Sequence, residues 1–231
     1  MSAALEIHDL KKQFRSPGGR ATMVVDVPQF DVAAGAHVAV RGESGSGKTT
    51  FLNLIAGILT PDAGKILVNG IPVTGLGEAD RDRLRATTIG YIFQTFNLLQ
   101  GCTALENVEL AMTFGRGSDR DAATQLLKQV GLSAHLHHVP RQLSVGQQQR
   151  VAVARALANH PSLVLADEPT GNLDERHAHD ALKLIRELCG ANGAALLLVS
   201  HSPSVLERFE QVVSFSNINR AAVAQPQGVP A

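Results

Sequence analysis

Short apolar runs alternate with segments of helical periodicity along most of the chain. Runs typical of buried strands lie at 37–41, 65–68, 89–93, 163–166 and 194–200. Residues 47–56 follow the first of these runs with helical spacing, and another helix is expected to begin just after Asp174. Strands that alternate with helices in this way predict an α/β fold whose sheet is mostly parallel.

The middle third of the chain has a different pattern. Segments 103–112, 119–130 and 144–158 are each typical of a helix, and no convincing strand lies between them. We therefore expect a single domain over residues 1–231, with an α/β core at about 1–94 and 159–216 and a helical subdomain at about 95–158. The remaining residues, 217–231, are expected to form a disordered tail because the final stretch is rich in Pro and Gln and has no periodicity.

Charge and composition exclude several classes of protein. The 21 basic and 21 acidic side chains balance, whereas a nucleic-acid binder usually has a basic excess, so no nucleic-acid partner is expected. No apolar run is long enough to cross a bilayer, and residues 1–14 lack the apolar core of a signal peptide. Two cysteines far apart in sequence favour a reducing compartment, where both remain thiols.

A glycine-rich segment follows the first apolar run. Residues 42–49 read Gly-Glu-Ser-Gly-Ser-Gly-Lys-Thr, which fits the phosphate-loop pattern G-x-x-x-x-G-K-[ST]. Glycines let backbone N–H groups point inward, and the helix that follows presents its positive end. Lys48 is expected to reach the β- and γ-phosphates of ATP, and Thr49 to bind Mg²⁺. The ATP-binding residues predicted here are Gly42, Glu43, Ser44, Gly45, Ser46, Gly47, Lys48, Thr49 and Thr50.

An apolar strand at 163–166 ends in two carboxylates, Asp167 and Glu168. Taken alone, an acidic pair at the end of a strand is usually part of a solvated turn. In ATPases with a phosphate loop, however, the strand-end aspartate holds Mg²⁺, and this position is Asp167. Glu168 is then placed to orient or deprotonate the attacking water.

A third motif, Leu-Ser-Val-Gly-Gln at 143–147, opens a predicted helix. Ser144 and Gln147 have the spacing of a capping box, which accounts for both residues. It does not account for Gly146, because glycine inside the first turn costs helix stability. The close approach of an anion to this helix end would explain it.

With this helix the sequence resembles the ABC transporter ATPases, whose signature is Leu-Ser-Gly-Gly-Gln, and the resemblance covers about residues 5–215. It implies a P-loop NTPase fold, with a RecA-like core, antiparallel strands at the N-terminus and an inserted helical subdomain. It also implies a homodimer in the ATP-bound state, in which Ser144, Gly146 and Gln147 bind the ATP held by the other subunit. Val145 replaces the first glycine of the signature, which puts the catalytic rate in question.

Further positions follow from the same resemblance. Phe93-Gln94 is similar to the glutamine loop, where Gln94 senses Mg²⁺ and a membrane partner, and 171–174 is similar to the D-loop that crosses the dimer interface. Ser200-His201 is similar to the switch histidine, which contacts the γ-phosphate. The implied catalytic residues are Lys48, Gln94, Glu168 and His201, and the implied metal-binding residues are Thr49, Gln94 and Asp167.

Phe14 resembles the aromatic residue that stacks on adenine in this family. The assignment stays open at this point, because an early phenylalanine is at least as often part of a core, and Phe30 is a rival for the same role.

Segments 92–99, 103–108 and 165–174 resemble one branch of the family, which includes lipoprotein-releasing, macrolide-exporter-type and cell-division ATPases. The branch implies a separate transmembrane permease with few spans, and peripheral attachment to the cytoplasmic side of the membrane through it. Two alternatives remain open: a conventional importer or exporter ATPase, and a regulatory module with little turnover. Glu168 and His201 argue against loss of catalysis.

The apolar residues Phe96, Leu98 and Leu99 directly follow Gln94. They either form part of the groove that receives a helix of the permease or belong to the core of the helical subdomain, and the sequence does not decide between the two.

Overall fold

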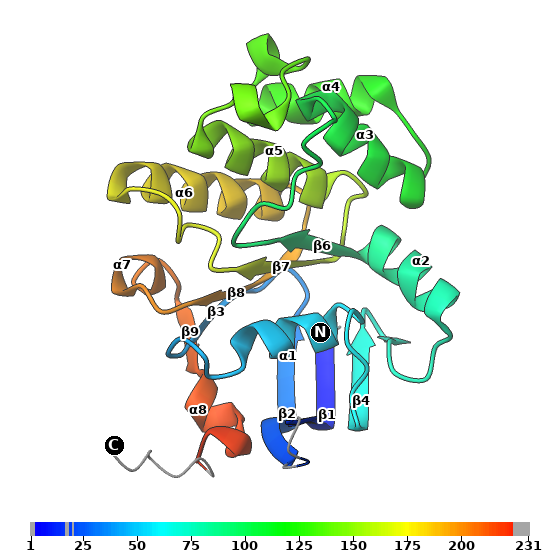
Figure 1. The fold of residues 1–231 in the computed structure, drawn as a ribbon, viewed down its shortest axis with the longest axis vertical. Helices are drawn as coiled ribbons and strands as arrows, with labels where there is room; N and C mark the ends of the chain where they lie inside the picture. The colour runs from blue at the N-terminus through cyan, green and yellow to red at the C-terminus, as the bar shows by residue number, and fades with distance from the viewer. Residues whose placement is uncertain (1–2, 17–18, 20, 224–231) are drawn as a thin grey trace.

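A computed structural model describes residues 3–16, 19 and 21–223, and within them the strands form two sheets (Figure 1). The first sheet is antiparallel, in the order β2-β1-β4-β5. Its strands are β1 (Ala3–Arg15), β2 (Ala21–Ala33), β4 (Ala63–Val68) and β5 (Ile71–Pro72). The second sheet is parallel throughout, in the order β6-β7-β8-β3-β9. Its strands are β3 (His37–Arg41), β6 (Ile89–Ile92), β7 (Leu163–Asp167), β8 (Ala195–Ser200) and β9 (Gln211–Ser214).

The predicted α/β class, with antiparallel strands at the N-terminus, is therefore confirmed. The longer helices are α1 (Lys48–Ile55), α2 (Glu78–Thr88), α3 (Ala104–Phe114), α4 (Arg120–Gln129), α5 (Val145–Leu157) and α6 (Glu175–Ala191). Shorter helical turns are η1 (Ser133–His135), η2 (Pro140–Gln142), α7 (Pro203–Leu206), α8 (Phe215–Ile218) and η3 (Arg220–Val223). In Figure 1, α3, α4 and α5 gather at one end of the molecule, the antiparallel sheet lies at the other, and the parallel sheet runs between them.

Three apolar clusters hold these layers together. One lies between the two sheets and includes Phe51 of α1, and a second packs α6 against the parallel sheet. The third joins α3, α4 and α5 and contains buried Phe96 and Leu98. These two residues therefore belong to the core of the helical part, whereas Leu99 is exposed.

Close backbone contact fixes the helical part to the parallel sheet at Gly90. A Cβ atom at this position of β6 would lie 2.3 Å from the carbonyl oxygen of Ala156 in α5, so only glycine fits without displacing the helix. Strand β6 and the C-terminal end of α5 are thus held in close contact.

Two segments differ from the expectations. Helix α2 was not predicted, because its sequence is almost entirely polar and Leu84 is its one buried residue. The disordered tail expected from residue 217 is wrong for 217–223, where α8 ends, η3 follows and Asn219 is buried. The Asn219 side chain accepts a hydrogen bond from Asp26 N at 2.7 Å and donates one to Val24 O at 3.0 Å. Residues 224–231 lie outside the described part.

Among the described residues, no helix combines the length and the hydrophobicity needed to cross a membrane.

Candidate nucleotide site

The carboxyl ends of β3, β7 and β8 meet at one edge of the parallel sheet, which is where ligands bind in open α/β sheets. A cavity of about 260 Å³ lies there. It is lined by Val24, Ser44, Gly45, Gly47, Lys48, Thr49, Thr50, Gln94, Asp167, Glu168 and His201. The structure therefore brings the glycine-rich segment, the acidic pair, Gln94 and His201 into one cavity, although up to 157 positions separate them in the sequence.

The glycine-rich loop between β3 and α1 has a fixed shape. Gly45 and Gly47 have φ of 78° and 99°, in the left-handed region where a side chain is strained. Lys48 is buried beneath this loop, and its Nζ donates to the carbonyl oxygens of Gly42 at 2.7 Å and Glu43 at 2.6 Å. Burial lowers the pKa of Lys48, while Glu168, Asp167 and Glu43 oppose that shift. A cation under a loop that leads into a helix N-terminus is an arrangement that could hold phosphate groups.

Asp167, at the end of β7, is only 6% exposed. Burial raises its pKa, and a hydrogen bond with the Thr49 side chain opposes the shift. A carboxylate beside a hydroxyl supplies the hard oxygen ligands that Mg²⁺ prefers, and a cation there would offset the cost of burying the charge. The residues present therefore fit a magnesium ion.

Glu168 follows at once, in a conformation that non-glycine residues rarely adopt, with φ of 44°. Such strain is concentrated at functional sites. Its side chain is held by two neighbours: Oε1 lies 2.7 Å from His201 Nδ1, and Oε2 accepts a hydrogen bond from Ser200 Oγ at 3.1 Å. The carboxylate is thus held in place in the lining of the cavity, where it can act on a water molecule.

The loop after Gln94 is tied down from two sides. Asn172 Nδ2 donates to Gln94 O at 2.7 Å, and the Arg155 guanidinium donates to Phe96 O and Asn97 O, both at 2.6 Å. Burial lowers the pKa of Arg155. These roles were not predicted from the sequence: Asn172 stood within the 171–174 segment without an assigned contact, and a basic residue inside a helical pattern such as Arg155 gives no signal.

The first turn of α5 lies apart from this cavity. Ser144 and Gln147 form the predicted capping box, with Gln147 N donating to Ser144 Oγ at 3.2 Å and Ser144 N donating to Gln147 Oε1 at 2.8 Å. Neither these two residues nor Gly146 is among the described residues that line the cavity. A Cβ atom on Gly146 would come no closer than 3.8 Å to His177, the nearest of the described residues, so packing among them does not require glycine.

The two candidates for the adenine-stacking residue, Phe14 and Phe30, differ in burial. Phe30 is 8% exposed and packs edge-on against Phe51, with ring centroids 5.8 Å apart, so it belongs to the core. Phe14 is 43% exposed on β1 and does not line the cavity described above. An adjoining cavity of about 640 Å³ is lined by Val24, by 41–46, by His201 and by 214–216. Val24 and 214–216 were not predicted from the sequence, because Val24 comes from the antiparallel sheet and 214–216 lie far along the chain, after β9.

Comparisons with known proteins show the family to which the chain belongs. The sequence model of the family described as ABC transporter matches residues 25–171. The lipoprotein-releasing system ATP-binding protein LolD of Pseudomonas syringae pv. tomato is 41% identical over 214 residues, which cover 91% of this chain and 94% of that protein. The ABC transporter ATP-binding protein YtrE of Bacillus subtilis is 46% identical over 179 residues, covering 76% of this chain and 78% of that protein.

Among solved structures, the chain is similar to the ATP-binding cassette MJ0796, in a dimeric post-hydrolysis state bound to ADP and Pi. The TM-score is 0.83 at 34% identity, and the match covers 91% of this chain and 93% of that one. Fold, motifs and nearly full-length relatives therefore agree: the chain belongs to the ABC transporter family, as an ATP-binding subunit that hydrolyses ATP.

Proposed function

We propose that the chain works as a head-to-tail homodimer, which binds two ATP molecules between its subunits and drives a separate membrane permease. The observation that carries this proposal is the separation of the two halves of the site. The phosphate loop and the acidic pair share a cavity, whereas Ser144 and Gly146 lie outside its lining. A second subunit, turned to face the first, supplies the missing half.

Within each site the chain's residues divide the chemistry. Lys48 exchanges its bonds with Gly42 O and Glu43 O for bonds with the β- and γ-phosphates of ATP. Glu168 orients the attacking water and accepts its proton, and His201 holds Glu168 and contacts the γ-phosphate. Thr49, Asp167 and Gln94 would hold Mg²⁺, and the ion would supply positive charge against the negative charge of the phosphates.

The residues at the start of α5, Val145 and Gly146, support a contact between this turn and a second copy of the chain. On the helix-interior scale glycine costs about 1 kcal/mol relative to alanine, and no atom of the described residues requires it here. Val145 beside it is 47% exposed, although it is apolar. Both features are explained if this turn faces the phosphates and the phosphate loop of a second copy.

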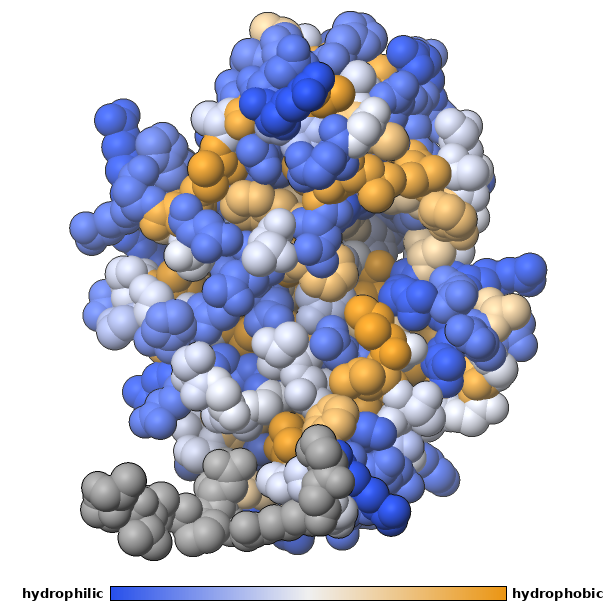
Figure 2. Space-filling view, viewed as in Figure 1, coloured by the Kyte–Doolittle hydropathy of each residue, from blue (hydrophilic) through white to orange (hydrophobic). Residues whose placement is uncertain are grey.

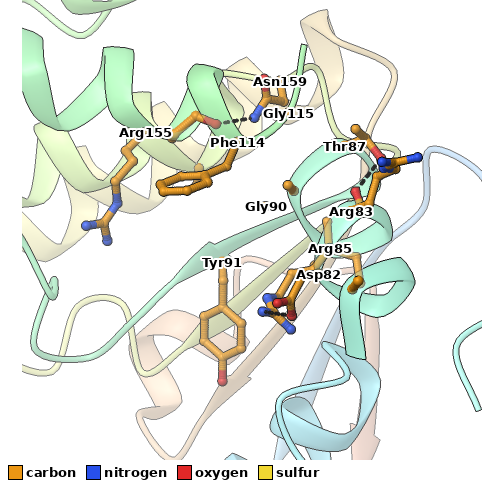
Figure 3. Close-up of a pocket in the computed structure, with 15 residues that line it drawn as sticks. Asp82, Arg83, Arg85, Thr87, Gly90, Tyr91, Phe114, Gly115, Arg155 and Asn159 are labelled. Atoms are coloured by element: carbon orange, nitrogen blue, oxygen red, sulfur yellow. Dashed lines mark hydrogen bonds and ion pairs between the residues drawn. The ribbon is translucent and has the colours of Figure 1, made fainter. Parts of the chain in front are cut away.

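A third cavity, larger than the two at the phosphate loop, supports a permease site. It measures about 800 Å³ and lies between α2, β6, α3 and α5 (Figure 3). Phe114, which is 70% exposed, lies on its rim, and Figure 2 shows apolar side chains gathered beside a hollow on this face. A helix of the permease seated here would cover this phenylalanine.

The same cavity is connected to the ATP site through Arg155. This residue lines the cavity and also holds Phe96 O and Asn97 O, just after Gln94. Movement of a permease helix against Arg155 would therefore shift the loop that carries Gln94. We place the chain on the cytoplasmic side of the membrane, attached through this contact.

Similarity to LolD over nearly the full length of both chains supports a permease of the lipoprotein-release or tripartite-efflux type. To test this, the chain is tagged, purified from detergent-solubilised membranes of its own source, and its membrane partner is identified by mass spectrometry. We expect a permease with few spans and a large extracytoplasmic domain. Phe114→Glu should lose this partner, whereas Ile71→Glu, which changes an exposed apolar residue on β5, should keep it.

Recovery of a permease with many spans would instead identify a conventional importer or exporter. If no integral membrane protein is recovered with the wild-type chain, the transport role is wrong.

Val145 provides a separate prediction about rate. Its backbone N–H remains available to a phosphate, because a β-branched side chain removes no donor, while its bulk stiffens the first turn of α5. We expect Val145→Gly to change steady-state phosphate release, measured in complex with the permease, by less than about tenfold, or roughly 1.4 kcal/mol in barrier. A silent wild type that becomes active in Val145→Gly would favour the regulatory module over a transport ATPase.

A further inference from the structure

A histidine on α6 lies against the signature turn. Asp174 caps α6, and its Oδ1 accepts a hydrogen bond from His177 N at 3.1 Å. The imidazole turns back to the same carboxylate, with Nδ1 2.5 Å from Asp174 Oδ2. These bonds from the His177 backbone and ring hold the pKa of Asp174 below its usual value, so Asp174 is a carboxylate and can only accept. The Nδ1 atom of His177 therefore carries a proton.

The other edge of the ring faces α5. His177 Cδ2 is the atom nearest to a Cβ built on Gly146, at 3.8 Å, and Cδ2 is bonded to Nε2. The side chain of His177 is 60% exposed, and no bond from its Nε2 to another described residue is found. The Nδ1 edge of the imidazole is thus fixed by Asp174, while Cδ2, the neighbour of Nε2 in the ring, lies beside Gly146.

We propose that His177 is a further ATP-binding residue, which donates from Nε2 to the phosphate chain of the ATP held by the second subunit. The inference rests on the proposed homodimer, because His177 does not line the phosphate-loop cavity of its own subunit. Since Nδ1 already carries a proton, donation from Nε2 requires the imidazolium. In this form both ring nitrogens donate, Nδ1 to Asp174 Oδ2 and Nε2 to a phosphate oxygen.

The bond from imidazolium to phosphate is charge-assisted and belongs to the strong class of hydrogen bonds. It is made in the ATP-bound dimer, so His177 should contribute to dimerisation and not to nucleotide binding by a single subunit. Asp174 then acts as a positioning residue, because it fixes the ring without touching the nucleotide.

The test uses Glu168→Gln as the parent, since this variant is expected to hold ATP without hydrolysing it. Light scattering measures the Mg-ATP concentration at which half of the protein is dimeric. We expect His177→Leu to raise that concentration about tenfold, the size expected from one charge-assisted bond. His177→Gln, whose amide N–H reaches about as far as Nε2, should stay within about threefold of the parent. His179→Leu makes the same change two positions further along α6, at a residue that lines a different cavity, and should match the parent.

ADP binding to the monomer, measured by calorimetry, should be the same in all four proteins. The inference is wrong if His177→Leu dimerises like the parent, if His177→Gln is as weak as His177→Leu, or if ADP binding falls with dimerisation. A parent that stays monomeric at saturating Mg-ATP would overturn the proposed homodimer itself, and this inference with it.

Discussion

Replacing Lys48 with alanine is expected to weaken Mg-ATP binding more than a hundredfold and to remove measurable hydrolysis. Lys48 is the one side-chain cation among residues 42–49, and it is buried close to Asp167 and Glu168. Without it, the negative phosphates would enter a cavity already lined by two carboxylates. Hydrogen bonds to charged groups contribute about 1.5–3 kcal/mol each, so two lost phosphate contacts account for an effect of this size. Calorimetry with Mg-ATP and steady-state phosphate release measure the two quantities.

Lys128→Ala, at an exposed position of α4, is the matched control and should behave as wild type. In Lys48→Ala the carbonyl oxygens of Gly42 and Glu43 lose their hydrogen-bond donor. Thermal unfolding is therefore measured as well, to show that the loss of binding does not come from a loss of folding. A folded Lys48→Ala protein that hydrolyses ATP at the wild-type rate would show that the phosphate site lies elsewhere.

Glu168→Gln is expected to slow hydrolysis at least a hundredfold while ATP remains bound, so that a stable dimer accumulates. The amide keeps the volume of the side chain and still accepts from Ser200 Oγ, but it cannot take a proton from water. The substitution also removes one negative charge next to the γ-phosphate, which favours the ATP-bound dimer. Single-turnover hydrolysis gives the rate, and light scattering gives the mass with and without Mg-ATP.

Glu187→Gln removes the same charge from an exposed position on α6 and should leave both measurements unchanged. Two results would count against the role of Glu168: wild-type turnover in Glu168→Gln, or a monomer under saturating Mg-ATP once binding has been verified.

Features that depend on neighbouring residues could be predicted from the sequence. Strand β3 and the glycine-rich segment 42–49 were evident because spacing alone specifies a strand, a turn and a helix. The capping box of Ser144 and Gln147 was predictable for the same reason, since both of its bonds span three residues. The capping pattern accounted for two residues of the signature and left Gly146 as the one that needed a partner.

Features that depend on distant contacts could not be predicted. Helix α2 has too few apolar residues to produce a periodic signal, and its place beside β6 is set by tertiary packing. Arg155 looks like any other basic residue of a helix, and only the folded chain brings it to Asn97, 58 positions away. Phe14 and Phe30 differ in burial because the two ends of a strand pair have different neighbours, which composition does not reveal.

The contacts of Asn219 have a consequence for how the chain can be shortened or extended. This residue binds Val24 O, and Val24 lines both cavities at the phosphate loop. The last helical turns therefore hold β2 in place, and β2 forms one wall of the nucleotide site. No catalytic motif lies near these turns in the sequence. A chain ending before residue 219 would keep every motif but lose the bonds of Asn219 with β2. A truncation or a fused tag should therefore be better tolerated after residue 223 than before residue 219.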